Sequence, residues 1–209
     1  MTDRSAGPSG AEAGERQERR VLHELVCAVT AAHYLFEVGG GSGLFLQRHL
    51  GLGGAGAFWT SLLSSWLTLA HRGRAPKLLA TAAGSALGTV VLHFDVWPWS
   101  VRRGLPLLEQ AEGFSPSWVP SYNALLYAWS AASVAAIALD SPRGARRWAL
   151  VGFLVTMPSK REALRHYAWV QEQAWVRPAW WNRSGRRRPG LDIASEEAPV
   201  LGGGMRGRS

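Results

Sequence analysis

Residues 78–94 read LLATAAGSALGTVVLHF and contain no aspartate, glutamate, lysine or arginine. An α-helix rises 1.5 Å per residue, so about 17 residues make the shortest helix that crosses the apolar core of a bilayer. Basic residues, Arg74 and Lys77, precede the run, and Asp95 and Pro98 follow it. The pattern predicts a membrane-spanning helix.

Further apolar runs lie on both sides of this segment. Residues 22–38 and 118–139 are long enough to span, and residues 57–70 reach that length only with the glycine-rich residues before them. A fifth run, residues 148–157, is too short alone and stops at Pro158. The sequence therefore predicts an all-α, polytopic transmembrane helix bundle of four to five spans. The fifth is a half-span, a re-entrant piece or a helix that bends at the proline.

Charged residues lie mainly outside these runs and make up only 18% of the chain, whose net charge is +8. We predict a disordered cytoplasmic tail over residues 1–20 and the transmembrane bundle over residues 21–170. Residues 171–209 are predicted to form an interfacial Trp/Arg segment followed by a disordered basic tail. The apolar runs exclude a disordered chain, and a single cysteine, Cys27, excludes a disulfide-stapled domain.

The basic residues also predict an orientation, because lysine and arginine accumulate in loops that stay in the cytoplasm. Three clusters lie before the first run, between the second and third, and after the fourth: Arg16, Arg19 and Arg20; Arg72, Arg74 and Lys77; Arg143, Arg146 and Arg147. We expect a multi-pass protein of the cell membrane with a cytoplasmic N-terminus. The side of the C-terminus depends on whether the fifth run crosses.

Positive charge in this chain does not point to nucleic acid, because no recognition fold accompanies it. The basic C-terminal tail instead suits anionic lipid headgroups. The expected partners are the lipid bilayer and a hydrophobic small-molecule substrate, and no nucleic acid. The oligomeric state stays open.

Ionisable residues inside the apolar runs are candidates for function, since a charge at the bilayer centre costs on the order of 2.5–3.5 kcal/mol by insertion scales. Glu37 and Asp95 end the first and third runs, which cross in the same direction, so both acids are expected at one boundary. His33 precedes Glu37 by four residues and shares its helical face. His93 precedes Asp95 by two, and Pro98 is expected to end the helix so that Asp95 turns inward.

These two acids and two histidines are the predicted catalytic residues. A carboxylic acid held among Trp and Tyr in a low-dielectric site stays protonated more readily and can deliver a proton. The competing interpretation is that the pairs are structural, with each histidine hydrogen-bonded to its neighbouring acid and no part in catalysis. A further pair, Glu162 and His166, joins the site only if the fifth helix crosses. No metal and no cofactor are predicted, because no multi-ligand signature such as HExxH occurs.

Aromatic residues gather near the same predicted boundary. The predicted substrate-binding residues are Tyr34, Trp97, Trp99, Trp118 and Tyr122. Aromatic faces attract cationic centres, so they could line the path of a reacting cation. An aromatic belt at the membrane surface is the alternative interpretation.

A small bundle with two intramembrane carboxylates and many aromatic faces resembles the integral-membrane terpene cyclases of meroterpenoid and indole-terpene pathways. The resemblance covers about residues 21–170 and rests on Phe36-Glu37-Val38 and on Asp95. It implies that one of these acids protonates an epoxide or alkene of a prenyl chain and that a second polar group assists or removes the final proton. Fungal members have more spans and a second acid late in the chain, whereas Asp95 is central.

Two functions are therefore expected from the sequence. The first is an acid/base enzyme, a cyclase or isomerase, acting on a prenylated or other lipidic substrate in the outer half of the bundle. The alternative is a non-enzymatic membrane subunit, small transporter or partner-binding protein whose buried acids hydrogen-bond between helices. The chain shows no duplicated halves of the kind found in many transporters.

Overall fold

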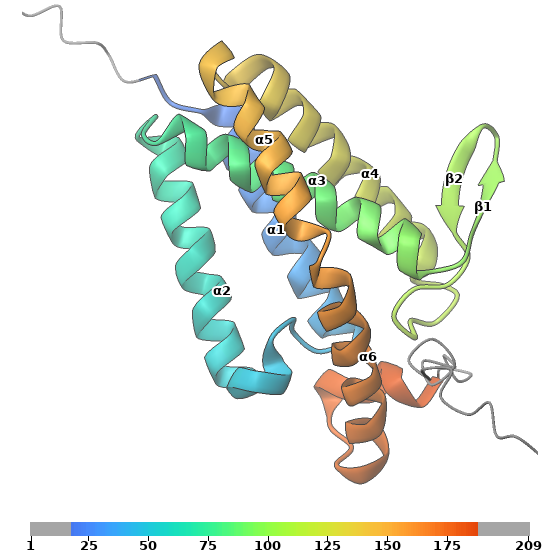
Figure 1. Ribbon diagram of the computed structural model, residues 1–209. Helices are drawn as coiled ribbons and strands as arrows, with labels where there is room; N and C mark the ends of the chain where they lie inside the picture. The colour runs from blue at the N-terminus through green and yellow to red at the C-terminus, as the bar shows by residue number, and fades with distance from the viewer. Residues whose placement is uncertain (1–17, 188–209) are drawn as a thin grey trace, which may run out of the picture.

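The computed structural model describes residues 18–187, so the predicted disorder of the two tails falls largely outside the described residues. The helices are α1 (Val21–Gly40), α2 (Gln47–His71), α3 (Pro76–Val96), α4 (Val119–Ala135), α5 (Arg143–Thr156) and α6 (Ser159–Val176). A π-helical turn, η1 (Ala136–Asp140), continues α4, and a 3₁₀ segment, η2 (Trp180–Arg187), follows α6 (Figure 1).

Among the described helices, three are long and apolar enough to cross a membrane: α1, α3, and α4 continued by η1. This finding supports a helical membrane bundle. The second and fifth predicted spans, in α2 and α5, do not meet the same measure. Helix α2 is long, but several serines, threonines and histidines lower its hydropathy, and α5 has only 14 residues. A total of four to five spans therefore stays a prediction.

Helices α3 and α5 pack with their backbones in close contact. A Cβ added to Gly84 would lie 1.9 Å from the carbonyl oxygen of Ala149, and one added to Gly152 would lie 1.9 Å from that of Thr81. Small residues allow such an approach between membrane helices. The small-residue face of α3 therefore packs against α5 within this chain. This packing fixes the position of α3, the helix that carries His93.

The N-terminus of α1 is capped by a residue that is distant in the sequence. The backbone N–H groups of Leu22 and His23 lie 3.0 and 3.2 Å from Oδ2 of Asp140, the last residue of η1. Arg20, which precedes the helix, supplies no side-chain cap, but its Nη1 donates to the carbonyl oxygen of Asp140 at 3.0 Å. An acid here satisfies free N–H groups and complements the helix dipole.

Asp140→Ala is expected to lower the free energy of unfolding by about 1–2 kcal/mol, because two N–H groups of α1 lose their acceptor. Chemical denaturation of the detergent-solubilised protein measures the change. The matched control is Asp95→Ala, which removes a surface ion pair and should cost less than about 1 kcal/mol. Equal losses in the two variants would show that Asp140 is not a cap.

A short hairpin follows α3, which the all-α prediction did not include. Strands β1 (Trp99–Arg102) and β2 (Leu105–Leu108) pair antiparallel, with Trp99 opposite Leu108. Arg103 and Gly104 join them with φ angles of 53° and 79°, as a tight hairpin turn requires. The side chain of Asn123 on α4 binds both the N–H and the carbonyl of Leu108, at 2.8 and 3.0 Å. The hairpin and the loop after it are thereby tied to the bundle.

Helix α6 bends away from α5 at Met157 and Pro158 (Figure 1), and a helix bent at this proline was one of the three alternatives that the sequence left open. Its first turns are joined to α2 and α3 by ion pairs. Glu162 lies 3.0 Å from Nη2 of Arg48 and 2.8 Å from Nε2 of His49, and Lys160 Nζ lies 3.0 Å from Asp95. These contacts hold α6 across one end of the helical bundle.

The contacts of Glu162 predict how this attachment depends on pH. Burial raises the pKa of Glu162, but the hydrogen bond to His49 and the positive charge of Arg48 outweigh it, so the pKa lies below its usual value. A lowered pKa stabilises the fold above the usual glutamate range and the gain is lost as the pH falls below it. We expect the opening free energy of α6, obtained from amide-exchange protection factors, to fall at acid pH by less than about 1 kcal/mol. In Glu162→Gln this pH dependence should disappear.

Candidate functional site

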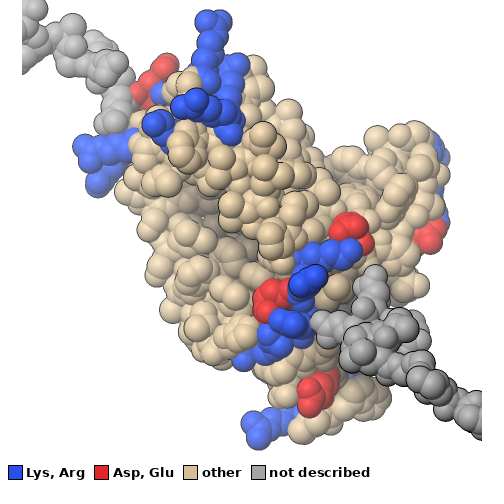
Figure 2. All heavy atoms as spheres, in the orientation of Figure 1, with Lys and Arg blue, Asp and Glu red and all other residues tan. Residues whose placement is uncertain are grey.

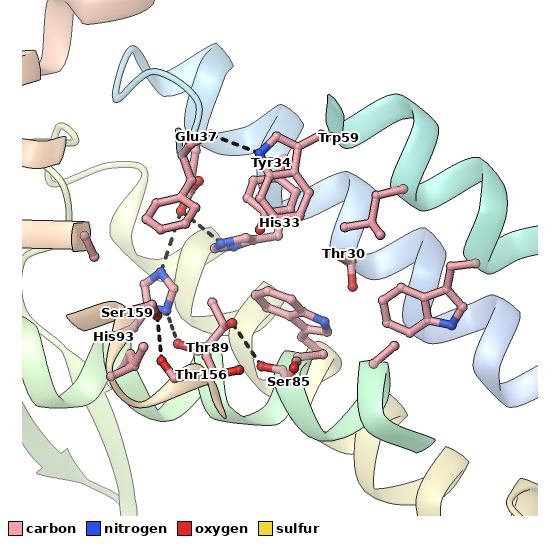
Figure 3. A pocket seen from close by; sticks show the side chains of 18 of the residues that line it. Thr30, His33, Tyr34, Glu37, Trp59, Ser85, Thr89, His93, Thr156 and Ser159 are labelled. Carbon is pink, nitrogen blue, oxygen red and sulfur yellow. Dashed lines mark hydrogen bonds and ion pairs between the residues drawn. The ribbon is translucent and has the colours of Figure 1, made fainter. Parts of the chain in front are cut away.

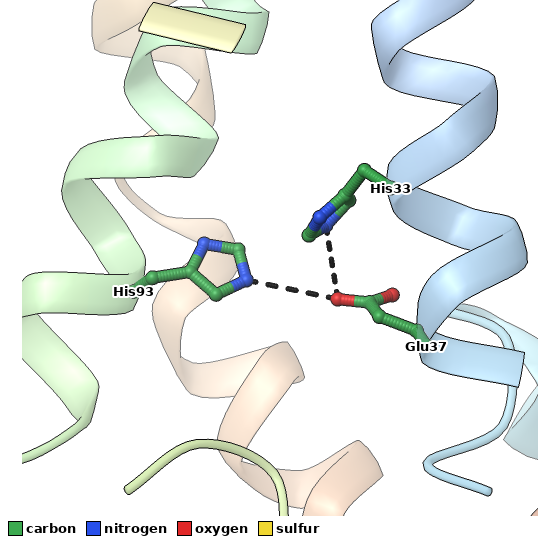
Figure 4. A group of neighbouring side chains, drawn as sticks. All are labelled: His33, Glu37 and His93. Atoms are coloured by element: carbon green, nitrogen blue, oxygen red, sulfur yellow. Dashed lines mark ion pairs between the residues drawn. The ribbon is translucent and has the colours of Figure 1, made fainter. Parts of the chain in front are cut away.

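The site is centred on Glu37, in the last turns of α1. His33 Nε2 lies 2.9 Å from Glu37 Oε1, as the four-residue spacing predicts, and His93 Nε2 approaches the same oxygen from α3 at 3.6 Å (Figure 4). All three side chains are buried. The two imidazole rings meet edge to face, with centroids 5.1 Å apart. The structure therefore brings three of the four predicted catalytic residues together.

A glycine turn fixes the end of α1 beside Glu37. Gly41 has a φ of 89°, a left-handed conformation in which its N–H reaches the carbonyl oxygens of Glu37 and Val38. The N–H and hydroxyl of Ser42 also donate to the Glu37 carbonyl, each at 3.0 Å. The backbone that carries Glu37 is thus held by the turn while its carboxylate points into the bundle.

Glu112 completes the cluster, and it was not among the predicted site residues. His93 Nε2 lies 3.4 Å from Glu112 Oε1, and the hydroxyl of Tyr167 on α6 donates to that oxygen at 2.7 Å. The Tyr122 hydroxyl lies 3.0 Å from Glu112 Oε1 and 3.2 Å from Glu37 Oε1. Tyr122 therefore bridges the two carboxylates.

The loop before α4 holds Glu112 in an unusual backbone conformation. Its φ is 49°, a left-handed value that is uncommon for residues other than glycine, and Gly113 follows with a φ of 71°. The side chain is fully buried, and its Oε2 has no hydrogen-bond partner among the residues described. Such strain persists only where the surrounding structure imposes it. No helical spacing links Glu112 to the other members, so sequence patterns could not place it here.

The contacts of His93 indicate where protons lie in the cluster. His93 Nδ1 lies 2.7 Å from the Thr89 carbonyl, which only accepts, so Nδ1 carries a proton and Nε2 faces the carboxylates. A neutral His93 would direct a lone pair at them, which is unfavourable while both carboxyl groups are ionised. Favourable contacts therefore require an additional proton on His93 Nε2 or on a carboxyl group.

An apolar cavity of about 530 Å³ opens beside the cluster (Figure 3). His33, Glu37 and His93 form its polar wall. The rest is mainly aliphatic and aromatic, including Leu62, Leu69, Leu79, Trp59, Trp66 and Trp129. A mostly apolar cavity with a few convergent polar groups is the usual form of a small-molecule site.

Aromatic rings surround the polar wall. His33 lies 4.4 Å from the Trp129 ring and 5.6 Å from Tyr122, and Tyr34 lies 4.2 Å from Trp59, measured between centroids. Of the predicted substrate-binding residues, Tyr34 and Trp97 line the cavity, and Tyr122 lies behind it in the cluster.

The other predicted residues lie away from the cavity. Asp95 does not turn inward, because α3 continues to Val96 and residues two apart face opposite sides of a helix. Its side chain is 53% exposed and pairs with Lys160. Trp99 is half exposed on β1, and Trp118 packs outside the cavity against Phe36, with ring centroids 5.0 Å apart.

Glu162 and His166, four residues apart, do not pair with each other. Glu162 contacts Arg48 and His49, whereas His166 lines the cavity with its Nε2 at 3.2 Å from the Ser42 carbonyl. Only His166 therefore reaches the site.

His33, Glu37 and His93 could also hold a metal ion, because their ligand atoms all lie within 4.8 Å of one another. Two imidazoles and a carboxylate are suitable ligands for zinc or another transition metal. These ligands come from two helices that are far apart in sequence, so no local motif marks them. The sequence-based expectation of a metal-free site stays a prediction, which metal analysis can check.

The chain matches no protein-family model, and comparisons with curated proteins and with solved structures give no match either. The fold and the site thus define the class by themselves: a helical bundle with three helices long and apolar enough to span a membrane, and a buried His–Glu cluster beside a mostly apolar cavity. The resemblance to membrane terpene cyclases stays a prediction.

Proposed function

We propose that this chain is an integral membrane acid/base enzyme, a cyclase or isomerase, that transfers protons to and from a prenylated or other lipidic substrate. The observation that carries the proposal is the place of Glu37, at the junction of a buried His–Glu–Tyr cluster and a mostly apolar cavity. Such a cavity admits a hydrocarbon and keeps most water out. A carboxylic acid there can act as a general acid and its carboxylate as a general base.

The cluster supports a division of roles between its two acids. Glu37 lines the cavity and can reach a substrate, whereas Glu112 lies behind it. Tyr122 contacts both carboxylates, and His93 lies within 3.6 Å of both. Glu37 is the proposed proton donor, and Glu112, Tyr122 and His93 return a proton to it through the hydrogen-bonded network.

The aromatic walls support a reaction that passes through a positive charge. Protonation of an alkene or epoxide leaves a cationic carbon centre. The faces of Trp59 and Trp129 line the cavity near Glu37. Aromatic faces stabilise cations electrostatically, most strongly where water is excluded.

We propose further that the protein crosses the cell membrane several times with its N-terminus in the cytoplasm. The start of α1, the α2–α3 turn and the start of α5 carry many of the basic residues. On the face shown in Figure 2, lysine and arginine gather at the ends of the molecule and leave a broad surface without charge between them. A reporter fused to either terminus tests the side on which each lies.

Transfer of deuterium from solvent tests the proposed chemistry without knowledge of the substrate. Membranes from cells with and without the protein are incubated in D₂O, and extracted lipids are compared by mass spectrometry. We expect one lipid species, present only with the protein, to gain deuterium on carbon, because the proton on Glu37 exchanges with solvent before its transfer.

Two results would overturn the proposal. The first is equal deuterium content in the lipids of both membranes across the extractable classes. The second is a stoichiometric transition metal in the purified protein that is lost in Glu37→Gln, because the cluster would then be a metal centre. Glu109→Gln, a change at an exposed hairpin residue, is the control for both measurements.

A further inference from the structure

The cavity is long and follows α3. Its lining residues on this helix run from Leu78, near the N-terminus, to His93 and beyond. Leu78 and His93 are fifteen positions apart, which corresponds to about 22 Å at 1.5 Å per residue.

The cavity forms an elongated slot with the volume of a single-ligand site. Its volume of about 530 Å³ lies within the range of about 300–1,000 Å³ that is usual for small-molecule sites. A slot of this length and volume suits one hydrocarbon chain that lies along α3.

The two ends of the slot differ in exposure. Leu78, at the start of α3, lines the cavity and is 63% exposed, so the mouth lies at this end of the helix. His33, Glu37 and His93 line the other end and are buried. A chain that enters from the bilayer through the mouth would reach Glu37 with its leading end.

The exposed side of the mouth is basic. Lys77 directly precedes Leu78, and its ammonium lies 5.7 Å from the centre of the Trp148 ring. Arg72 and Arg74 lie in the adjoining α2–α3 turn, and all three residues are exposed. Basic side chains at a membrane surface attract anionic headgroups, with about fivefold in affinity for each residue.

We propose that the substrate is a single-chain amphiphile with an anionic headgroup, bound with that headgroup at Lys77 and the far end of its chain at Glu37. The reacting carbon is then remote from the headgroup. This inference rests on the proposed function for the reaction, whereas the placement of the chain rests on the shape and charge of the cavity alone.

Photolabelling of the full-length protein in detergent tests the placement. Two long-chain fatty acids are used as probes, one with a diazirine near the methyl end and one with a diazirine near the carboxylate. Labelling is assigned to individual residues: the first probe should label residues next to His33 and His93, and the second should label residues next to Leu78. The reverse order, or one pattern for both probes, would overturn the proposal.

Three variants test the placement further. Ala82→Phe narrows the middle of the slot and should abolish labelling at the deep end while labelling at the mouth remains. Val91→Phe, on the lipid-exposed side of the same helix, is the matched control and should change neither. Lys77→Gln should weaken labelling by both probes about fivefold.

Failure of this proposal can be told apart from failure of the proposed function, because labelling requires no turnover. Correct placement without deuterium transfer would leave the protein as a lipid-binding protein. Deuterium transfer to a lipid with two chains or a neutral headgroup would support the proposed enzymatic function and exclude the proposed substrate class.

Discussion

Glu37→Gln is expected to lower protein-dependent deuterium transfer to lipid by about 100-fold or more, the typical contribution of a positioned acid or base. Glutamine has nearly the same shape and can still contact His33, but its amide has no acidic proton to deliver. Glu37 is also the carboxylate of the cluster that lines the cavity. The amount of protein in the membrane should stay the same.

Glu112→Gln distinguishes a relay from a direct role. Because Glu112 lies behind the cavity, its loss should slow the return of a proton to Glu37 and leave binding of the lipid unchanged. The variant should therefore lower the maximal rate with little change in the substrate concentration at half-maximal rate. Thermal unfolding is measured in parallel for both variants. Normal deuterium transfer in Glu37→Gln would contradict the catalytic role of Glu37. If both variants instead unfold at lower temperature and less protein reaches the membrane, the two acids stabilise the fold and do not act in catalysis.

Gly152→Ala is expected to lower the free energy of unfolding by about 3 kcal/mol, at the upper end of the usual cost of overpacking. The new methyl group would lie 1.9 Å from the Thr81 carbonyl oxygen and 2.9 Å from the Ser85 nitrogen. Both are backbone atoms of α3 and cannot move without displacing the helix. Because α3 carries His93, the variant should also disturb the cluster.

Gly144→Ala is the matched control for this change, because it lies on α5 and has no atom within 4 Å of the added Cβ. Alanine at such a helical position should leave stability unchanged or raise it by about 0.5–1 kcal/mol. Denaturation of both variants in the same detergent measures the difference. Equal stability of the two variants would mean that α3 and α5 are not packed at their glycines.

Local sequence patterns, such as apolar runs and four-residue spacing, were enough to predict the contacts that lie within one helix. The apolar run at residues 78–94 became α3, and the four-residue step from His33 to Glu37 became an ion pair at 2.9 Å. The position of Pro98 correctly placed the end of α3 nearby. It did not decide the direction of Asp95, because the helix continues through this residue to Val96 and keeps its side chain on the outer face.

Periodicity and hydropathy alone thus indicate a helical membrane bundle with His33 and Glu37 on one face, since both depend on steps of a few residues. Only the packing of α1, α3, α4 and α6 brings His93, Glu112, Tyr122 and Tyr167 to Glu37 and leaves Asp95 outside. The cause is physical: Glu112 lies in a loop held in a left-handed conformation, and its partners come from helices up to 55 residues away. Contacts of that kind follow from the tertiary fold, and no spacing in the chain encodes them.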